Sequence, residues 1–121
     1  MSADLIRIDG RELQLGAEPI PTASLREGSE YFSVQYADEQ LLIPIIGTWI
    51  YIGRGLEESE PDLLYFQDVE SYHQGVRYGK SGEENASFHL SRDGKLHHMF
   101  DFERALNELL KCALRRCRTS E

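Results

Sequence analysis

The residues best suited to chemistry in this sequence are two histidines on either side of a predicted turn. His89 and His97 flank Arg92-Asp93-Gly94, which reads as a three-residue hairpin loop with Gly94 in a left-handed bulge. In that register the two imidazoles are cross-strand neighbours with Cβ atoms about 5 Å apart. Two imidazoles at this distance can share a zinc ion, but the sequence offers no third ligand, so exposed histidines on a solvated sheet face are the simpler interpretation.

A second candidate is an acidic segment between Arg54 and Arg77, which contains no lysine or arginine. Carboxylates clustered in a loop can coordinate calcium, which takes about six to eight oxygen ligands. The EF-hand pattern is absent, and a run of acidic residues is more often a solvated surface. The candidate calcium ligands are Glu57, Glu58, Glu60 and Asp62.

A third candidate is a basic face on the last predicted helix, formed by Arg104, Lys111, Arg115 and Arg118. Cations near a helix C-terminus offset the macrodipole, which explains part of the cluster. The functional alternative is a docking surface for an acidic partner, including residues 57–70 of a second copy. Self-association is therefore one hypothesis.

The two cysteines, Cys112 and Cys117, both fall in this helix. Five positions of separation place them on different sides of the helix, so they cannot form a disulfide with each other while it is intact. We expect two reduced thiols with a packing role, as is typical of proteins in a reducing compartment.

The element that positions the basic face is the best defined in the sequence. A helix is predicted over residues 101–118, with Asp101 as the N-cap. Its apolar residues form one stripe, which we expect to face a sheet. The stripe consists of Phe102, Leu106, Leu109, Leu110, Ala113 and Cys117.

The remaining elements are mostly strands. Alternating apolar residues and turn signals predict hairpins over residues 5–15 and 86–100, and strands over residues 31–37 and 41–52. Residues 63–73 fit neither period and are interpreted as a short helix. We therefore predict one α+β domain over residues 1–121, an antiparallel sheet of about five to seven strands covered by the C-terminal helix.

Charge and hydropathy exclude several classes of function. Thirteen basic and 21 acidic residues give the 121-residue chain a net charge of −8, which repels nucleic acid and anionic lipid. The longest apolar stretch, residues 41–52, is shorter than the roughly 20 residues that cross a bilayer. Residues 1–14 are charged and lack the apolar core of a signal peptide. We expect a cytoplasmic protein without a nucleic-acid or membrane partner.

These observations favour a small acidic binding or regulatory module without enzymatic activity. One alternative is a divalent-cation binder, with calcium at the acidic loop or zinc at the histidines. A second alternative is an enzyme or small-ligand carrier with a pocket between sheet and helix. We expect that pocket to be lined by Trp49, Tyr51, Tyr65 and Tyr72.

Overall fold

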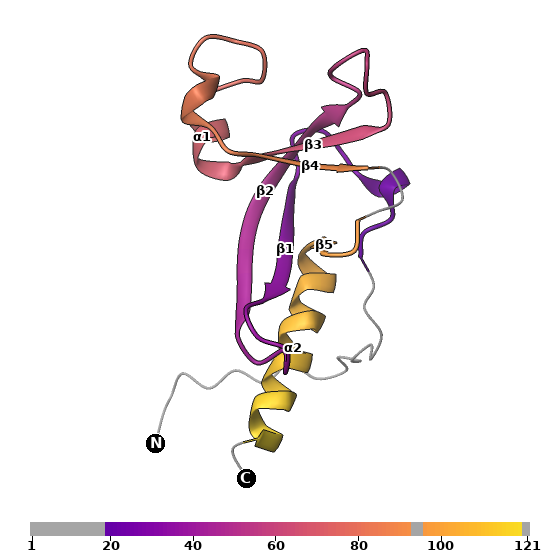
Figure 1. Cartoon of the computed structure of the whole chain (residues 1–121), viewed down its shortest axis with the longest axis vertical. Coiled ribbons are helices and arrows are strands. Elements are labelled where there is room, and N and C mark those ends of the chain that lie inside the picture. Colours follow the sequence, from indigo (N-terminus) through magenta and orange to yellow (C-terminus); the bar gives the residue numbers. More distant parts are fainter. Residues whose placement is uncertain (1–18, 93–95, 120–121) are drawn as a thin grey trace, which may run out of the picture.

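A computed structural model describes residues 19–92 and 96–119. In this part of the chain, five antiparallel strands form one sheet in the order β4-β3-β2-β1-β5. The elements are η1 (Thr22–Ser24), β1 (Glu30–Tyr36), β2 (Pro44–Arg54), β3 (Leu63–Asp68), α1 (Val69–His73), η2 (Glu83–Asn85), β4 (Phe88–Arg92), β5 (Met99–Phe100) and α2 (Phe102–Thr119). Helix α2 lies alongside the β1–β2 hairpin (Figure 1). The α+β class, the antiparallel sheet and the C-terminal helix are confirmed.

Strand β2 is longer than its neighbours, and its two halves lie in different surroundings. It pairs with β1 from Pro44 to Ile50 and with β3 from Trp49 to Arg54. Within the described residues, the half from Pro44 to Thr48 therefore has a strand on one side only. This half projects beyond β3 and β4, next to α2 (Figure 1).

The two faces of the sheet have separate cores. On one face, aromatic residues of β1, β2 and β3 pack under the segments that precede β1 and β5; this cluster is Ile20, Tyr31, Tyr51, Leu64, Phe66, Leu96 and Met99. On the other face, Val34 and Phe100 pack against Ala105 of α2, flanked by Phe32, Tyr36 and Leu109. Alternation along β1 sends Tyr31 to the first core and Val34 to the second.

The predicted hairpin over residues 86–100 is wrong. Its strands lie at opposite edges of the sheet, because β4 pairs with β3 and β5 pairs with β1. This arrangement buries both Met99 and Phe100, whereas a hairpin would have buried only one of the two alternating side chains. The predicted hairpin over residues 5–15 lies outside the described residues.

The short helix predicted over residues 63–73 is correct only for its second half. Residues 63–68 form β3, and α1 begins at Val69. Four consecutive residues of β3, from Leu64 to Gln67, are buried because both faces of the strand are covered. A strand covered on both faces loses its alternation, which explains why the sequence showed neither period.

Helix α2 begins as predicted and ends on the β1–β2 turn. The Asp101 carboxylate accepts a hydrogen bond of 2.8 Å from the Arg104 backbone N–H, which confirms the cap. Near the other end, Arg116 donates to the Leu42 carbonyl at 2.9 Å. A further bond of 2.8 Å runs from Arg115 to the Leu41 carbonyl. These contacts fix which side of α2 faces the sheet.

The side of α2 that faces the sheet overlaps the predicted stripe only in part, since Leu109 packs against the second core. The buried positions are Ala105 and Cys112, while Phe102, Leu110 and Cys117 are exposed. At about 100° per residue, the centre of the stripe is turned from the buried side by roughly a quarter of a turn. Part of the apolar stripe therefore faces outward. No helix among the described residues is long and apolar enough to cross a bilayer.

Candidate functional site

The outward half of the α2 stripe joins an exposed part of the sheet. Phe102, Leu106, Leu110 and Leu114 are spaced four residues apart and form one ridge along the helix. Beside the start of this ridge lie Phe32 of β1 and Ile46 of β2, which belongs to the half of β2 that pairs only with β1 in the described part of the chain. We call these six residues the α2–β2 apolar surface.

A shallow groove runs between the helix and the strands of this surface. It has a volume of about 180 Å³ and a wholly apolar lining of Phe32, Ile46, Phe102, Ala105, Leu106 and Leu109. The rings of Phe32 and Phe102 meet edge to face, with centroids 5.5 Å apart. Even so, Phe102 remains 67% exposed and Ile46 52% exposed. Contiguous exposed apolar side chains of this kind are typical of interaction surfaces.

Most side chains of the predicted basic face form ion pairs or hydrogen bonds within the chain. The Arg104 guanidinium contacts the Asp101 carboxylate at 2.6 Å, and Lys111 forms an ion pair with Glu108. Arg115, besides its bond to the β1–β2 turn, has its guanidinium 5.1 Å from the Tyr36 ring centroid. Three of the four residues therefore stabilise the fold, and Arg118 is the exposed member of the set.

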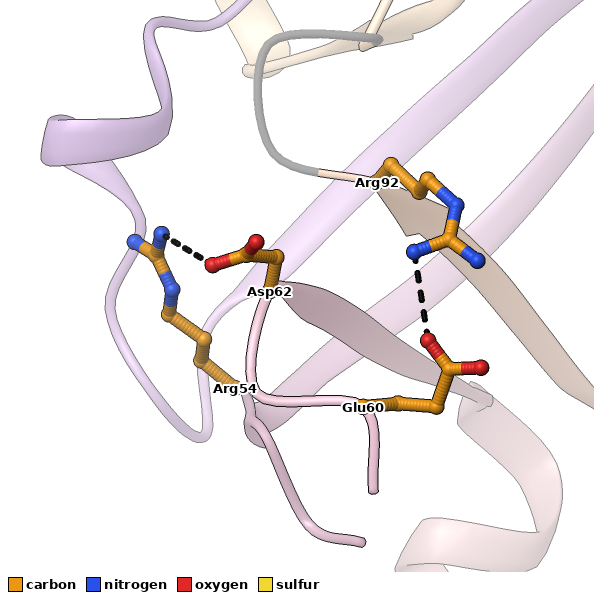
Figure 2. Close-up of polar contacts among 4 residues, drawn as sticks. All are labelled: Arg54, Glu60, Asp62 and Arg92. Carbon is orange, nitrogen blue, oxygen red and sulfur yellow. Dashed lines mark hydrogen bonds and ion pairs between the residues drawn. The ribbon is translucent and has the colours of Figure 1, made fainter. Parts of the chain in front are cut away.

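The acidic segment is also largely paired within the chain, as Figure 2 shows. Arg92 of β4 contacts Glu60 at 3.2 Å, and Arg54 of β2 contacts Asp62 at 3.8 Å. Both pairs are exposed, so each contributes at most about 1 kcal/mol. The carboxylates point to separate bases and do not converge on a common centre.

Glu57 has a different partner. The Tyr78 hydroxyl donates a hydrogen bond of 2.6 Å to its carboxylate. This bond, helped by burial, raises the pKa of Tyr78 well above its usual value, since losing the proton would place two negative charges together. Glu58 is exposed on the same loop. The four predicted calcium ligands thus have different surroundings.

The two predicted zinc ligands line one pocket, although they are not cross-strand neighbours. His89 of β4 and His97, in the segment before β5, border a cavity of about 190 Å³ with Trp49. His98 lines the same pocket. In the predicted hairpin, alternation along a strand would have turned His98 to the face opposite His97. In the described part of the chain, no three or more His, Cys, Asp or Glu side chains are grouped to hold a metal ion.

The His89 ring is packed as an aromatic group. Its centroid lies 5.6 Å from that of Trp49 and 6.2 Å from that of Phe66. Partial burial, reinforced by the nearby His98, lowers the pKa of His89. The lowered pKa favours the neutral ring, and the His89 contacts shown by the structure are those with Trp49 and Phe66.

A further pocket has no counterpart in the sequence predictions. It lies between β2, β3 and the loop after α1, with a volume of about 420 Å³; its lining is Ile52, Leu56, Glu57, Gln67, Arg77, Tyr78, Gly79 and Lys80. Gln67 donates through Nε2 to Ser71 Oγ at 2.8 Å and to the Val76 carbonyl at 2.9 Å. Its Oε1 is buried and has no hydrogen-bond partner in the described part of the chain. In the sequence, the one indication of this pocket is a glutamine, Gln67, that directly follows an apolar run.

The pocket predicted from four aromatic residues is not formed. Trp49 and Tyr51 alternate onto one face of β2, with Tyr51 opposite Phe66 of β3. Tyr65, one position earlier than Phe66, therefore points to the other face, where its ring packs 5.1 Å from that of Tyr78. Tyr72 lies on α1, with the Arg77 guanidinium 3.9 Å from its ring centroid. The four aromatic residues therefore do not line one pocket.

Comparison of the chain with protein families, with curated proteins and with solved structures gives no significant match in any of the three.

Proposed function

We propose that this protein is a small non-enzymatic binding module that docks another protein surface onto its α2–β2 apolar surface. The observation that carries the proposal is the exposure of one ridge of α2 together with Ile46 on β2. Apolar side chains gathered on one face, with no charge in the groove between them, favour burial against a protein partner.

Other surfaces support docking less well. The carboxylates of Glu57, Glu60 and Asp62 each have a donor within the chain, so using them would require breaking existing contacts. The net charge of −8 disfavours nucleic acid and anionic membranes as partners. We place the module in a reducing compartment such as the cytoplasm, since its cysteines do not form a disulfide and Cys112 is buried.

Site-specific photo-crosslinking in producing cells tests this proposal. A benzophenone amino acid at Leu110 should give defined adducts with protein, because that side chain lies in the middle of the ridge. The matched control is Leu90, an exposed leucine of β4 that lies outside the α2–β2 apolar surface. Defined adducts from position 110 but not from position 90 support the proposal. Equal yields at both positions, or none at position 110, contradict it.

A second candidate function is the binding of a small ligand in the pocket beside Gln67. A buried carbonyl oxygen without a donor costs about 1–3 kcal/mol, which a ligand N–H or O–H, or a water molecule, would recover. The pocket volume of about 420 Å³ lies within the range of small-molecule sites. Arg77 and Lys80 at the lining favour a ligand that also carries an anionic group.

Native mass spectrometry of the purified chain tests this candidate. A retained ligand adds a fixed mass to the wild-type chain. Lys80→Ala should lower the fraction of ligand-bound chain, because it removes an exposed cation from the pocket lining and leaves the hydrogen bonds of Gln67 in place. Leu110→Glu, outside the pocket, serves as the matched control. A wild-type spectrum showing only the bare chain contradicts the candidate.

A further inference from the structure

We propose that the partner of the α2–β2 apolar surface is a second copy of the same chain, with the two α2 helices packed antiparallel across a two-fold axis near Leu110. This inference rests on the proposed function and names its partner. Three features support it: the symmetry of the ridge, the charges at its two ends, and the apolar area that it offers.

The ridge is self-complementary about its centre. Steps of four residues run from Phe102 through Leu106, Leu110 and Leu114 to Arg118. With the axis at Leu110, each copy sets Leu106 against the partner's Leu114, and the two Leu110 side chains meet. A two-fold axis through the middle of the ridge closes the assembly at two copies.

Charge selects the antiparallel direction. The first turn of α2 carries Glu103 and the last turn carries Arg116 and Arg118. In an antiparallel pair the acidic start of one helix lies beside the basic end of the other, and the helix dipoles also oppose each other favourably. A parallel pair would place like charges together at both ends. The distribution of charge therefore fits one orientation.

The exposed area is sufficient for a modest dimer. Phe102, Ile46, Leu114 and Leu110 are 67%, 52%, 46% and 36% exposed. At about 200 Å² for a fully exposed large side chain, they offer on the order of 400 Å² of apolar area per copy. Interfaces are usually about 57–65% apolar by area. Two copies that bury these side chains together with a polar rim of that proportion would bury about 1,200–1,400 Å² in total, near the lower bound for stable interfaces.

Sedimentation equilibrium between about 1 and 200 µM measures the association directly. The wild-type mass should rise from 13.9 kDa towards twice that value. Leu110→Glu brings two carboxylates together at the axis and should hold the mass at the monomer value, while Leu90→Glu makes the same change on β4 and should leave the rise intact. Unchanged far-ultraviolet circular dichroism shows that each variant is folded. A wild-type monomer at every concentration, or equal effects of both variants, overturns the inference.

Disulfide trapping tests the geometry. In a Cys117→Ser background, Leu110→Cys lies at the axis and should give a covalent dimer on mild oxidation. Phe102→Cys lies at the far end of the ridge, where its counterpart is Arg118 of the other copy, and should give little. Self-crosslinking at position 102 equal to that at position 110 excludes the antiparallel arrangement.

The outcomes separate this inference from the proposed function. If the purified protein is a monomer and the cellular adducts from position 110 contain a different protein, the dimer is refuted while docking at this surface stands. If position 110 gives no adducts in cells, the proposed function is itself refuted.

Discussion

Replacing Gly47 with alanine should disturb the strand pair β1–β2 through the side chains of Trp49 and Ser33. The Trp49 indole N–H donates a hydrogen bond of 3.0 Å to Ser33 Oγ across the pair. A Cβ atom on Gly47 would lie 2.7 Å from Trp49 Nε1 and 2.8 Å from Ser33 Oγ. Real Cβ atoms essentially never approach so closely, so the indole must move and its hydrogen bond must break.

The expected loss of stability follows from three contributions. The hydrogen bond is worth about 1 kcal/mol, and displacing a packed ring costs about 2 kcal/mol. The lower conformational entropy of unfolded alanine returns up to about 1 kcal/mol. The net free energy of unfolding should fall by about 2 kcal/mol, and Tm by about 6–10 °C for a chain of this size.

Thermal and urea unfolding measure this change, with Trp49 as the reporter because it is the only tryptophan in the chain. In its folded state, the Gly47→Ala variant should show an altered Trp49 emission spectrum. Ser33→Ala should lower the free energy of unfolding by about 1 kcal/mol and displace the indole ring little. In a Trp49→Phe background, followed by circular dichroism, Gly47→Ala should cost less than about 1 kcal/mol. The reasoning is refuted if Gly47→Ala keeps the wild-type Tm and emission spectrum.

Three further predictions concern individual side chains. Burial raises the pKa of Asp68, but hydrogen bonds led by that from Ser71 outweigh this effect and lower it overall. Both carboxylate oxygens accept hydrogen bonds, and Asp68→Asn replaces one of them with a donor, so this variant should cost about 1 kcal/mol at pH 7. The difference in Tm should shrink as the pH falls below 3.8. Burial and the charge of His98 lower the pKa of His89, so the unfolded chain takes up this proton first. Stability should fall as the pH drops below 6.5, and His89→Gln should flatten that part of a Tm–pH curve. A thiol reagent should modify Cys117 in the native protein, while the second cysteine, buried under the β1–β2 turn, should react only on unfolding; equal native rates would contradict the packing of α2.

The parts of the fold that depend on nearby residues could be predicted from the sequence. The Asp101 cap and the alternation of β1 are local signals, and both agree with the structure. Strand pairing is not local. A turn signal at residues 92–94 predicted a hairpin, yet β4 pairs with β3 and β5 pairs with β1, where Met99 and Phe100 are both buried.

The candidate site depended on how α2 is turned about its axis, which its periodicity alone does not determine. The stripe shows which residues are apolar, but Ala105 and Cys112 face the sheet because the end of the helix is bonded to the carbonyls of Leu41 and Leu42. These contacts join residues far apart in the sequence. Three residues of the proposed docking ridge, Phe102, Leu106 and Leu110, were therefore predicted to be core.

The half of β2 that has no second neighbouring strand among the described residues also bears on misassembly of this protein. Its outer edge offers backbone groups for strand addition, and Ile45 and Ile46 beside it are both more than half exposed. Pro44 contributes no backbone N–H at one end of this edge, and Gly47 is a weak strand former in its middle. Both residues make this stretch a poorer template for edge-to-edge joining of sheets.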